Sequence, residues 1–372
     1  MSKSDIHRIA INTGGGDAPG LNAVIRAAVL SANLRGWEVL GVHRGYEGLL
    51  DTSKTEILDK DRVRGITHLG GTILGTSNKG NPFEMPMKLP DGTETVIDRS
   101  AEVVENFNRL GLDALIAIGG DGSMRIAHEF CKQGLPIVGV PKTIDNDLEG
   151  TVVTFGFDTA VSVATAAVGR LHSTAEAHER VFTVEVMGRY AGWIALAAAT
   201  AGGADVALIP EIPFDIDIVC RKIMTREARG RRFSLVVVAE GATPIGGKMV
   251  TQGPKEAGRE VVLGGIGEQV AHQIQERTGK ETRNVVLGHL QRGGTPNARD
   301  RLLALRFGSA AVRVIAEGES GVMVALDPPL VKTVPLAKAT SRMKTVPFDS
   351  DILCTARETG ICLGDDWEHA TY

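Results

Sequence analysis

Two short acidic loops, each directly after an apolar run, carry the residues best suited to chemistry. The first, Gly119–Ser123 (GGDGS), follows the strand-like run Ala114–Ile118 and precedes a helical pattern. Backbone amides at a helix N-terminus attract phosphate, and Mg²⁺ binds carboxylates together with phosphate oxygens. Asp121 is therefore a candidate magnesium ligand, and a simple helix cap is the alternative.

The second acidic loop is Pro141–Asp147 (PKTIDND), again after an apolar run. In an extended loop Asp145 and Asp147 point to the same side, so one could serve as a general base and the other as a metal or water ligand. Lys142 and Thr143 offer a cation and a hydroxyl to a phosphoryl group in transfer. The alternative is a solvated turn rich in Asp.

A glycine-rich loop, Thr13–Gly20 (TGGGDAPG), lies between a strand-like run and a helical pattern. Glycines let backbone amides approach a ligand closely, and the helix that follows adds positive potential. The spacing fits neither G-x-G-x-x-G, because Pro19 occupies the last required position, nor a Walker A loop. The loop by itself does not favour phosphate binding over the alternative of an ordinary tight turn, and its spacing disfavours a nicotinamide oxidoreductase.

Basic residues follow two further strand-like runs. Arg189 ends the turn Met187–Arg189, and the segment His289–Gly294 places His289 and Arg292 three residues apart, where they could grip one anion. A salt-bridged surface Arg and a structural His are the alternatives.

Two other arginines, Arg180 and Arg283, lie at the starts of their strands. Ligands of α/β proteins collect at the carboxyl ends of parallel strands, so these arginines should lie on the wrong side of the sheet. They could reach an active site only at a subunit boundary.

The elements that must position these loops alternate between strand-like and helical patterns, which predicts an α/β fold with mainly parallel sheets covered on both faces. A hairpin is expected at Met87–Ile97 and a surface loop at Gly241–Glu260. Expected strands are Arg8–Asn12, Glu38–Val42, Ala114–Ile118, Ile137–Val140, Val181–Val186, Val206–Ile209, Ser234–Ala239, Asn284–Leu287 and Val322–Ala325. Expected helices are Leu21–Leu34, Met124–Gln133, Thr159–Ala175, Tyr190–Ala201, Gly267–Arg277 and Asp300–Ile315.

The composition suits two domains and a cytoplasmic protein. The chain has 372 residues, 43% of them hydrophobic, and a net charge of −4, which argues against nucleic-acid and membrane partners. The four cysteines have no metal-ligand spacing and are expected to be reduced thiols or buried filler. The N-terminus lacks an apolar signal core, and the apolar stretch Ala191–Ala204 is too short to span a bilayer.

Five motifs together resemble the 6-phosphofructokinase family, over about residues 8–325: GGDAPGLN (15–22), GGDGS (119–123), PKTIDND (141–147), EVMGRYAG (185–192) and GHLQRGG (288–294). The resemblance implies two Rossmann-like three-layer α/β/α domains with the active site in the cleft between them. The phosphoryl-donor domain would comprise residues 1–156 plus about 291–340. The fructose 6-phosphate domain would comprise residues 157–290 plus the C-terminal segment.

The resemblance also implies a glycolytic kinase that uses ATP and Mg²⁺ to phosphorylate the 1-hydroxyl of D-fructose 6-phosphate. Asp145 would be the general base and Asp121 the Mg²⁺ ligand, while Lys142 and Arg189 would neutralise the transferring group. Sugar phosphate contacts would come from Thr143, Ile144, Asp145, Arg180, Met187, Gly188, Arg189, Glu240, Arg283, His289, Leu290, Gln291 and Arg292. Donor contacts would come from Gly15, Asn78, Lys79, Gly120, Asp121, Gly122 and Ser123.

In this family Arg180 and Arg283 match arginines that reach across a subunit interface, which implies a homodimer or homotetramer with shared active sites. Two residues indicate different phosphoryl donors. Gly122 leaves room for a nucleotide, whereas Lys142 matches the pyrophosphate-dependent pattern. We predict ATP, because a side chain at position 122 would collide with the α-phosphate, whereas Lys142 only adds charge.

Several other functions stay open. The nearest alternative is a pyrophosphate-dependent phosphotransferase. A related NAD or lipid kinase would share the GGDG loop but has no need of PKTIDND and MGRYAG together. A non-catalytic nucleotide-sensing subunit would be expected to lack Asp121 or Asp145, and both are present.

Overall fold

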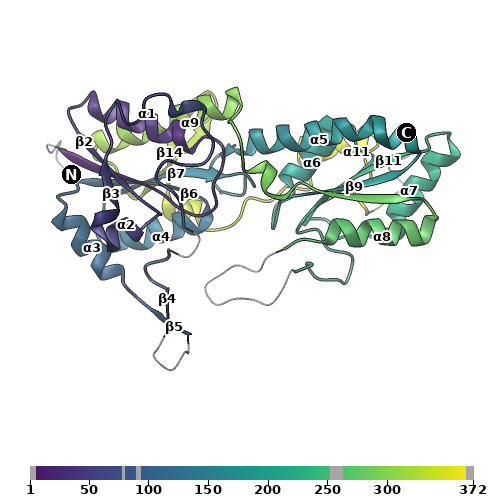
Figure 1. The fold of residues 1–372 in the computed structure, drawn as a ribbon, viewed down its shortest axis with the longest axis horizontal. Coiled ribbons are helices and arrows are strands. Elements are labelled where there is room, and N and C mark those ends of the chain that lie inside the picture. The colour runs from purple at the N-terminus through teal and green to yellow at the C-terminus, as the bar shows by residue number, and fades with distance from the viewer. Residues whose placement is uncertain (1–5, 78–79, 89–93, 252–262, 366–372) are drawn as a thin grey trace.

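The computed structural model describes residues 6–77, 80–88, 94–251 and 263–365. Its elements form two mainly parallel sheets that lie side by side along the long axis, each with helices on both faces (Figure 1). The predicted α/β class with mainly parallel sheets is confirmed. The strands are β1 (Arg8–Thr13), β2 (Glu38–Val42), β3 (Thr55–Ile57), β4 (Met85–Lys88), β5 (Glu94–Ile97), β6 (Ala114–Gly119), β7 (Ile137–Thr143), β8 (Phe155–Gly156), β9 (Val181–Val186), β10 (Val206–Leu208), β11 (Ser234–Ala239), β12 (Thr282–Val286), β13 (Val322–Asp327) and β14 (Leu330–Pro335).

The helices differ widely in length and lie between most of these strands. They are α1 (Leu21–Asn33), α2 (Glu47–Leu50), α3 (Ser100–Arg109), α4 (Asp121–Lys132), α5 (Phe157–His178), α6 (Trp193–Gly202), α7 (Ile216–Ala228), α8 (Ile266–Thr278), α9 (Ala298–Ala316), α10 (Leu336–Ala339) and α11 (Asp351–Glu358). Three short 3-10 turns are η1 (Thr52–Lys54), η2 (Ile66–His68) and η3 (Gly288–Gln291).

The larger sheet has eight strands, in the order β14-β13-β7-β6-β1-β2-β3, with the short β8 also paired to β7. Its inner strands run parallel, and only the edge strands β3 and β14 run antiparallel to their neighbours. Successive residues of β1 face opposite sides: Ile9 and Ile11 pack with α1 and α9, whereas Ala10 packs with α3 and α4. This alternation buries both faces of the strand, which explains its almost continuous apolar sequence.

The smaller sheet has four strands, all parallel, in the order β10-β11-β9-β12. Residues of α5, α6 and α11 cover one face, and residues of α7 and α8 cover the other. The apolar stretch near residue 200 forms α6, which packs into this core. Among the described residues no helix is both long and apolar enough to cross a membrane.

The end of the chain passes from one sheet to the other (Figure 1). Strand β14 forms an edge of the larger sheet and helix α10 packs against that sheet, whereas α11 packs against α6 beside the smaller sheet. The segment between α10 and α11 therefore crosses beside the junction of the two sheets.

Two predicted boundaries were wrong at functionally important places. Helix α4 begins at Asp121 rather than Met124, so the acid lies in the first turn. Strand β7 continues through Lys142 and Thr143, because these residues pair with Phe155 and Gly156 of β8. The short strand β8 carries no sequence pattern of its own, so the extension could not be foreseen.

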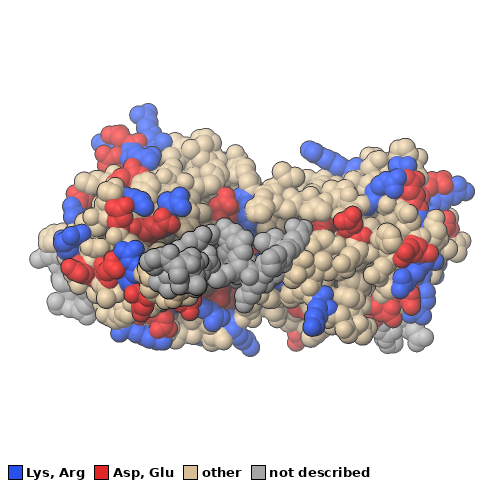
Figure 2. Space-filling model, turned by 60° about the horizontal axis from the view of Figure 1, so that its bottom comes forward, with Lys and Arg blue, Asp and Glu red and all other residues tan. Residues whose placement is uncertain are grey.

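The predicted hairpin is confirmed as β4 paired antiparallel with β5, although its turn lies outside the described residues, as does part of the predicted loop at 241–260. The four cysteines are free, but Cys354 is exposed rather than buried. On the face shown in Figure 2, basic and acidic side chains are interspersed, as the net charge of −4 suggests.

Candidate active site

The glycine loops after β1 and β6 touch each other at the carboxyl edge of the larger sheet. The amide of Gly14 donates to the carbonyl of Ile118 at 2.9 Å. A Cβ added at Gly14 would lie 2.7 Å from Ser123 Oγ, and one added at Gly119 would lie 2.2 Å from Ser123 Cβ. Any side chain would separate the loops, so glycine is required here for packing.

Gly122 differs from these glycines. It is exposed, and a Cβ added there would meet no atom of the described residues within 4 Å. The fold of this chain therefore does not require glycine at position 122. A requirement for glycine there would have to come from a ligand over the N-terminus of α4.

Two cations hold the first glycine loop. Lys142 is buried at the end of β7, and its Nζ donates to the carbonyl of Gly16. Arg292 Nη1 donates to the carbonyl of Asp17 at 3.1 Å. Burial, and secondly the nearby Arg292, lower the pKa of Lys142 to about 8, against the opposing effect of acids that include Asp17. Positive charge therefore gathers where the glycine loop meets the acidic loop.

The two carboxylates Asp145 and Asp147 lie close enough to perturb each other. Burial raises the pKa of Asp145 to about 7, Asp147 raises it next, and Arg292 and Lys142 oppose the shift. Burial also raises the pKa of Asp147. One oxygen of each, Oδ1, is buried and has no hydrogen-bond partner among the described residues. Buried polar atoms are normally paired, so both oxygens are positioned to contact a ligand.

The route of the chain between these acids differs from the prediction. Asn146 has a φ of 52°, in the left-handed region, so the loop bends and is not extended. The proximity of the two acids therefore comes from this bend and not from the alternation of side chains along an extended segment. Asn146 Oδ1 accepts hydrogen bonds from the amide of Thr154 at 3.1 Å and from Lys344 Nζ at 2.8 Å.

Asp121 lies in the first turn of α4 and does not cap the helix, because Gly120 occupies the cap position. Its Oδ2 accepts from Arg125 Nε at 2.8 Å. Its charge contributes to the raised pKa of Asp147, so Asp121 lies near the acidic loop.

These acids suit magnesium. Within the described residues, no group of three potential ligands could enclose a metal ion by itself. Mg²⁺ usually binds one or two carboxylates and completes its shell with water and substrate phosphates. Asp121, together with the unpaired oxygen of Asp147, fits that requirement.

The smaller sheet contributes a second set of charges. Glu240 follows β11, and its amide donates to the carbonyl of Val186 at 2.9 Å. Burial raises the pKa of Glu240, whereas Arg189, Arg292 and His289 lower it. Glu240 in turn raises the pKa of Asp145, so charges from both sheets act on one carboxylate.

The turn that carries Arg189 is tightly constrained. Gly188 has a φ of 135°, and a Cβ added there would lie 2.8 Å from the carbonyl oxygen of Ala191. A Cβ added at Gly241 would lie 1.9 Å from the carbonyl oxygen of Arg189. Both glycines are needed for this turn, which brings Arg189 to the carboxyl end of β9. Met187, the first residue of the turn, is buried in the core of the smaller sheet.

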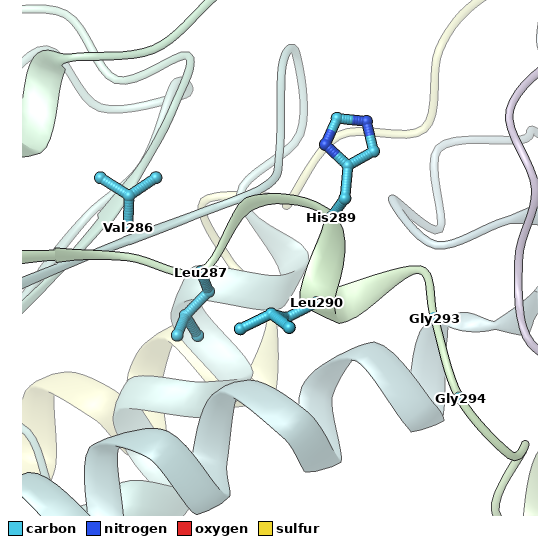
Figure 3. A pocket seen from close by; sticks show the side chains of 6 residues that line it. All are labelled: Val286, Leu287, His289, Leu290, Gly293 and Gly294. Atoms are coloured by element: carbon cyan, nitrogen blue, oxygen red, sulfur yellow. The ribbon is translucent and has the colours of Figure 1, made fainter.

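The segment at η3 divides its residues between two environments. His289 and Arg292 both lower the pKa of Glu240, so both lie near this carboxylate. Figure 3 shows the side chain of His289 pointing away from that of Leu290, which lies beside Leu287, although both His289 and Leu290 line the same open hollow. Gln291 is fully buried, and its Nε2 donates to the carbonyl of Gly288 at 3.1 Å, so its side chain turns into the protein.

Arg180 and Arg283 lie at the amino ends of β9 and β12, and both pair with Glu281. The distance along β9 from Arg180 to Met187 is about 20 Å at the usual rise of a strand. Within one chain these arginines therefore do not join the other candidate residues.

The remaining predicted residues have simpler positions. Ile144 is fully buried in the core of the smaller sheet, so only its backbone is available to a ligand. Thr143 Oγ1 accepts from the amide of Asp145 at 3.1 Å. The amide of Gly15 donates to the carbonyl of Ser77 at 3.3 Å, and Asn78 and Lys79 lie outside the described residues.

Sequence patterns did not point to Lys344 and Glu211, which contact the loops of this site. Neither residue lies in a recognisable motif, and both come from segments whose path only the fold reveals.

The chain belongs to the phosphofructokinase family, whose profile matches residues 8–315. An ATP-dependent 6-phosphofructokinase of Chloroflexus aurantiacus is 53% identical over 361 residues, covering 96% of this chain and 98% of that protein. ATP-dependent 6-phosphofructokinase 1 of a Synechocystis species is 50% identical over 365 residues, covering 97% of this chain and 99% of that protein.

Solved structures share the fold. Phosphofructokinase of Pichia pastoris is 32% identical with a TM-score of 0.78, and the match covers 91% of this chain but only 36% of that longer chain. A pyrophosphate-dependent phosphofructokinase of Marinobacter aquaeolei has a TM-score of 0.77 at 21% identity, covering 98% of this chain and 90% of that chain. The last similarity concerns the fold alone.

Proposed function

We propose that this protein is an ATP-dependent 6-phosphofructokinase, which transfers the γ-phosphoryl group of ATP to the 1-hydroxyl of D-fructose 6-phosphate. The observation that carries the proposal is the environment of Asp145. This carboxylate has an unpaired buried oxygen and a pKa raised by burial to about 7, and it lies among Lys142, Arg292 and Glu240. Relatives about half identical over nearly the whole chain bear the same activity in their names.

Asp145 acts as the general base that accepts the proton of the sugar hydroxyl. A base works best when its pKa lies near the operating pH, because it is then both ionised and basic enough to accept a proton. The raised pKa of Asp145 meets this condition, whereas an ordinary Asp would be a much weaker base.

Lys142 and Arg189 neutralise the charge of the phosphoryl group during transfer. Phosphoryl transfer needs positioning and charge stabilisation more than covalent chemistry, so fixed cations supply much of the catalysis. Lys142 is suited to this role because it is buried and fixed on the first glycine loop.

The donor lies over the glycine loops after β1 and β6, with Gly15, Gly120 and Ser123 among its contacts. Asp121, and Asp147 through its unpaired oxygen, would hold Mg²⁺, which supplies charge neutralisation between the phosphates. The open space at Gly122 supports ATP as the donor. Lys142 supports the second candidate, pyrophosphate, because its ammonium lies beside the same loop.

Fructose 6-phosphate lies between the acidic loop and the ends of β9 and β11, near Arg189, Glu240, His289 and Arg292. This places the active site in a cleft between a donor-binding unit, residues 1–156 plus about 291–340, and a sugar-binding unit, residues 157–290 plus the C-terminal segment. The division is supported by the two sheets, which draw on the same parts of the chain.

Arg180 and Arg283 contact the 6-phosphate of a sugar bound to a neighbouring subunit. Their position at the amino ends of β9 and β12 supports this role, because they lie far from the other site residues of their own chain. The protein is then a homodimer or homotetramer with shared active sites. We place this glycolytic enzyme in the cytoplasm, where its free cysteines stay reduced.

A coupled assay of the purified protein tests the proposal. Fructose 6-phosphate is offered with Mg²⁺ and either ATP or pyrophosphate, and formation of fructose 1,6-bisphosphate is measured. We expect turnover with ATP. Turnover with pyrophosphate alone would identify the second candidate, and no turnover with either donor would contradict the proposed activity.

A further inference from the structure

A short segment near the end of the chain, residues 342–346, contacts functional loops of both sheets; we call it the crossing segment. It lies beyond the residues 8–315 that match the family profile. Met343 forms an antiparallel bridge with Leu148, and the amide of Lys344 donates to the carbonyl of Asp147 at 2.8 Å. The segment therefore runs directly beside the acidic loop.

The half-buried side chain of Lys344 adds further contacts to the acidic loop and to the residues that follow it. Its Nζ donates to Asn146 Oδ1 at 2.8 Å, to the carbonyl of Thr151 at 2.9 Å and to the carbonyl of Val152 at 3.0 Å. Three donors on one ammonium thus meet three acceptors, which satisfies its hydrogen-bonding capacity.

Asn146 is the residue through which this contact reaches the active site. Its backbone has a left-handed φ of 52°, which asparagine tolerates better than most non-glycine residues, and the surrounding contacts select this conformation over the ordinary ones. The buried Asn146 side chain is held by Lys344 and by the amide of Thr154. Because Asn146 stands between Asp145 and Asp147, its conformation sets the direction of both carboxylates.

The other side of the crossing segment contacts the start of α6. Trp193 Nε1 donates to the carbonyl of Lys344 at 3.1 Å, and the ammonium of Lys344 lies 5.9 Å from the centre of the Trp193 ring. The amide of Val346 donates to Glu211 Oε1 at 2.8 Å, and both oxygens of Glu211 accept from the amide of Gly192 at 3.0 Å. Gly192 closely follows Arg189, so the segment links the acidic loop to the turn that carries this arginine.

We propose that Lys344 is a positioning residue of the phosphoryl-transfer site, which holds the bend at Asn146 and thereby orients Asp145 and Asp147 relative to Arg189. All three hydrogen bonds of its ammonium go to Asn146, Thr151 and Val152, and its charge also interacts with Asp147, so its hydrogen bonds act on the reacting groups through the loop. The inference rests on the proposed function, because the orientation of Asp145 matters for catalysis only if Asp145 is the general base.

The test compares Lys344→Met with Lys338→Met. The first variant removes the three donors and keeps an apolar stem of similar length; the second removes an exposed lysine of α10 from the same part of the chain. Misplacement of catalytic groups by about 1 Å costs about 100-fold in rate, so we expect kcat of Lys344→Met to fall about 10- to 100-fold. KM for fructose 6-phosphate and ATP should stay within about three-fold, because ground-state contacts are retained. Lys338→Met should match the wild type.

A second readout needs no catalysis. Hydrogen exchange of the full-length protein should be faster in Lys344→Met over residues 143–154, which include the Thr154 amide bonded to Asn146, and unchanged in Lys338→Met. In an Asn146→Gly background, where glycine adopts the bend without support, Lys344→Met should lower kcat by less than it does alone.

The outcomes separate the two proposals. An inactive wild type with either donor overturns the proposed function, while hydrogen exchange still tests the positioning. An active wild type with unchanged kcat in Lys344→Met, or with only KM raised, overturns the positioning role. If Lys344→Met does not fold, the positioning role is tested with Trp193→Phe, which removes one hydrogen bond to the crossing segment. A kcat lowered about three-fold or more supports the role, and an unchanged kcat overturns it.

Discussion

The acidic limb of the pH profile should report Asp145, and its position can be worked out from the structure. The pKa of Asp145 is raised by burial to about 7, and a base must be deprotonated to act. With that value, about nine-tenths of the carboxylate is ionised at pH 8 and about one-tenth at pH 6. We therefore expect kcat/KM to fall about ten-fold between pH 8 and pH 6. An Asp of ordinary pKa would give no fall in this range.

The phosphate of the substrate also titrates near pH 6, so a variant is needed to assign the limb. Asp147 raises the pKa of Asp145, and Asp147→Asn removes that negative charge. The limb should then move to lower pH if it belongs to Asp145, and a limb due to the substrate should stay in place. The assay measures kcat/KM for fructose 6-phosphate from pH 5.5 to 9 for both proteins. A limb that does not move, or that moves to higher pH, would refute the assignment.

Three further predictions concern stability, donor choice and assembly. Because the pKa of Asp145 is higher in the folded than in the unfolded state, Asp145 destabilises the folded state increasingly from about pH 4 to pH 7. Asp145→Asn should therefore raise the Tm at pH 8 and leave it nearly unchanged at pH 4. An equal effect on the Tm at both pH values would contradict the raised pKa. Gly122→Asp should fold with a stability within about 0.5 kcal/mol of wild type, because the added side chain meets open space, yet lose about 10- to 100-fold in kcat/KM for ATP by repelling its phosphates. The matched variant Gly119→Ala should instead be destabilised, because its added side chain clashes with Ser123. An unchanged kcat/KM for ATP in Gly122→Asp would argue against binding of ATP beside Gly122. Mixed oligomers of inactive Asp145→Asn and inactive Arg180→Ala subunits should regain activity if each site draws on two subunits, and no recovery on mixing would contradict shared sites.

Most strands were predictable because both faces of each sheet are buried, whereas β3, β8, β14 and the helices α3 and α7 were not predicted. Strands such as β9 and β11 are rich in valine and other apolar residues, and their predicted bounds match the structure. The positions of the chemical loops followed from the same patterns, because parallel strands bring their carboxyl ends to one edge. Glu240, which follows a strand of the other sheet and is far from Asp145 in the sequence, contributes to the raised pKa of Asp145.

Features that depend on distant partners were not predictable. Lys142 lies in a strand because Phe155 pairs beside it, and the bent acidic loop is contacted through Asn146 by Lys344, nearly two hundred residues later. No local pattern encodes either contact. Gln291 lies in a motif that suggests ligand binding, yet its side chain is buried and bonded to its own turn, since the 3-10 conformation rotates it inward.

The glycines of the site also divide into those that contacts within the chain explain and one that they do not. Gly119 and Gly188 are explained by contacts within the chain, namely the nearness of Ser123 and a left-handed turn beside Ala191. Gly122 has no such explanation among the described residues, which is why it bears on the donor and the other two do not.

The most direct test of the account is the product formed from fructose 6-phosphate and ATP, followed by phosphorus NMR, with the wild type and with Asp145→Asn. The account predicts a new phosphomonoester at carbon 1 for the wild type. For Asp145→Asn it predicts a kcat lower by about a thousand-fold or more with KM nearly unchanged, since the general base is lost while the binding contacts remain. A phosphate at another carbon, or a near-normal kcat in Asp145→Asn, would contradict it.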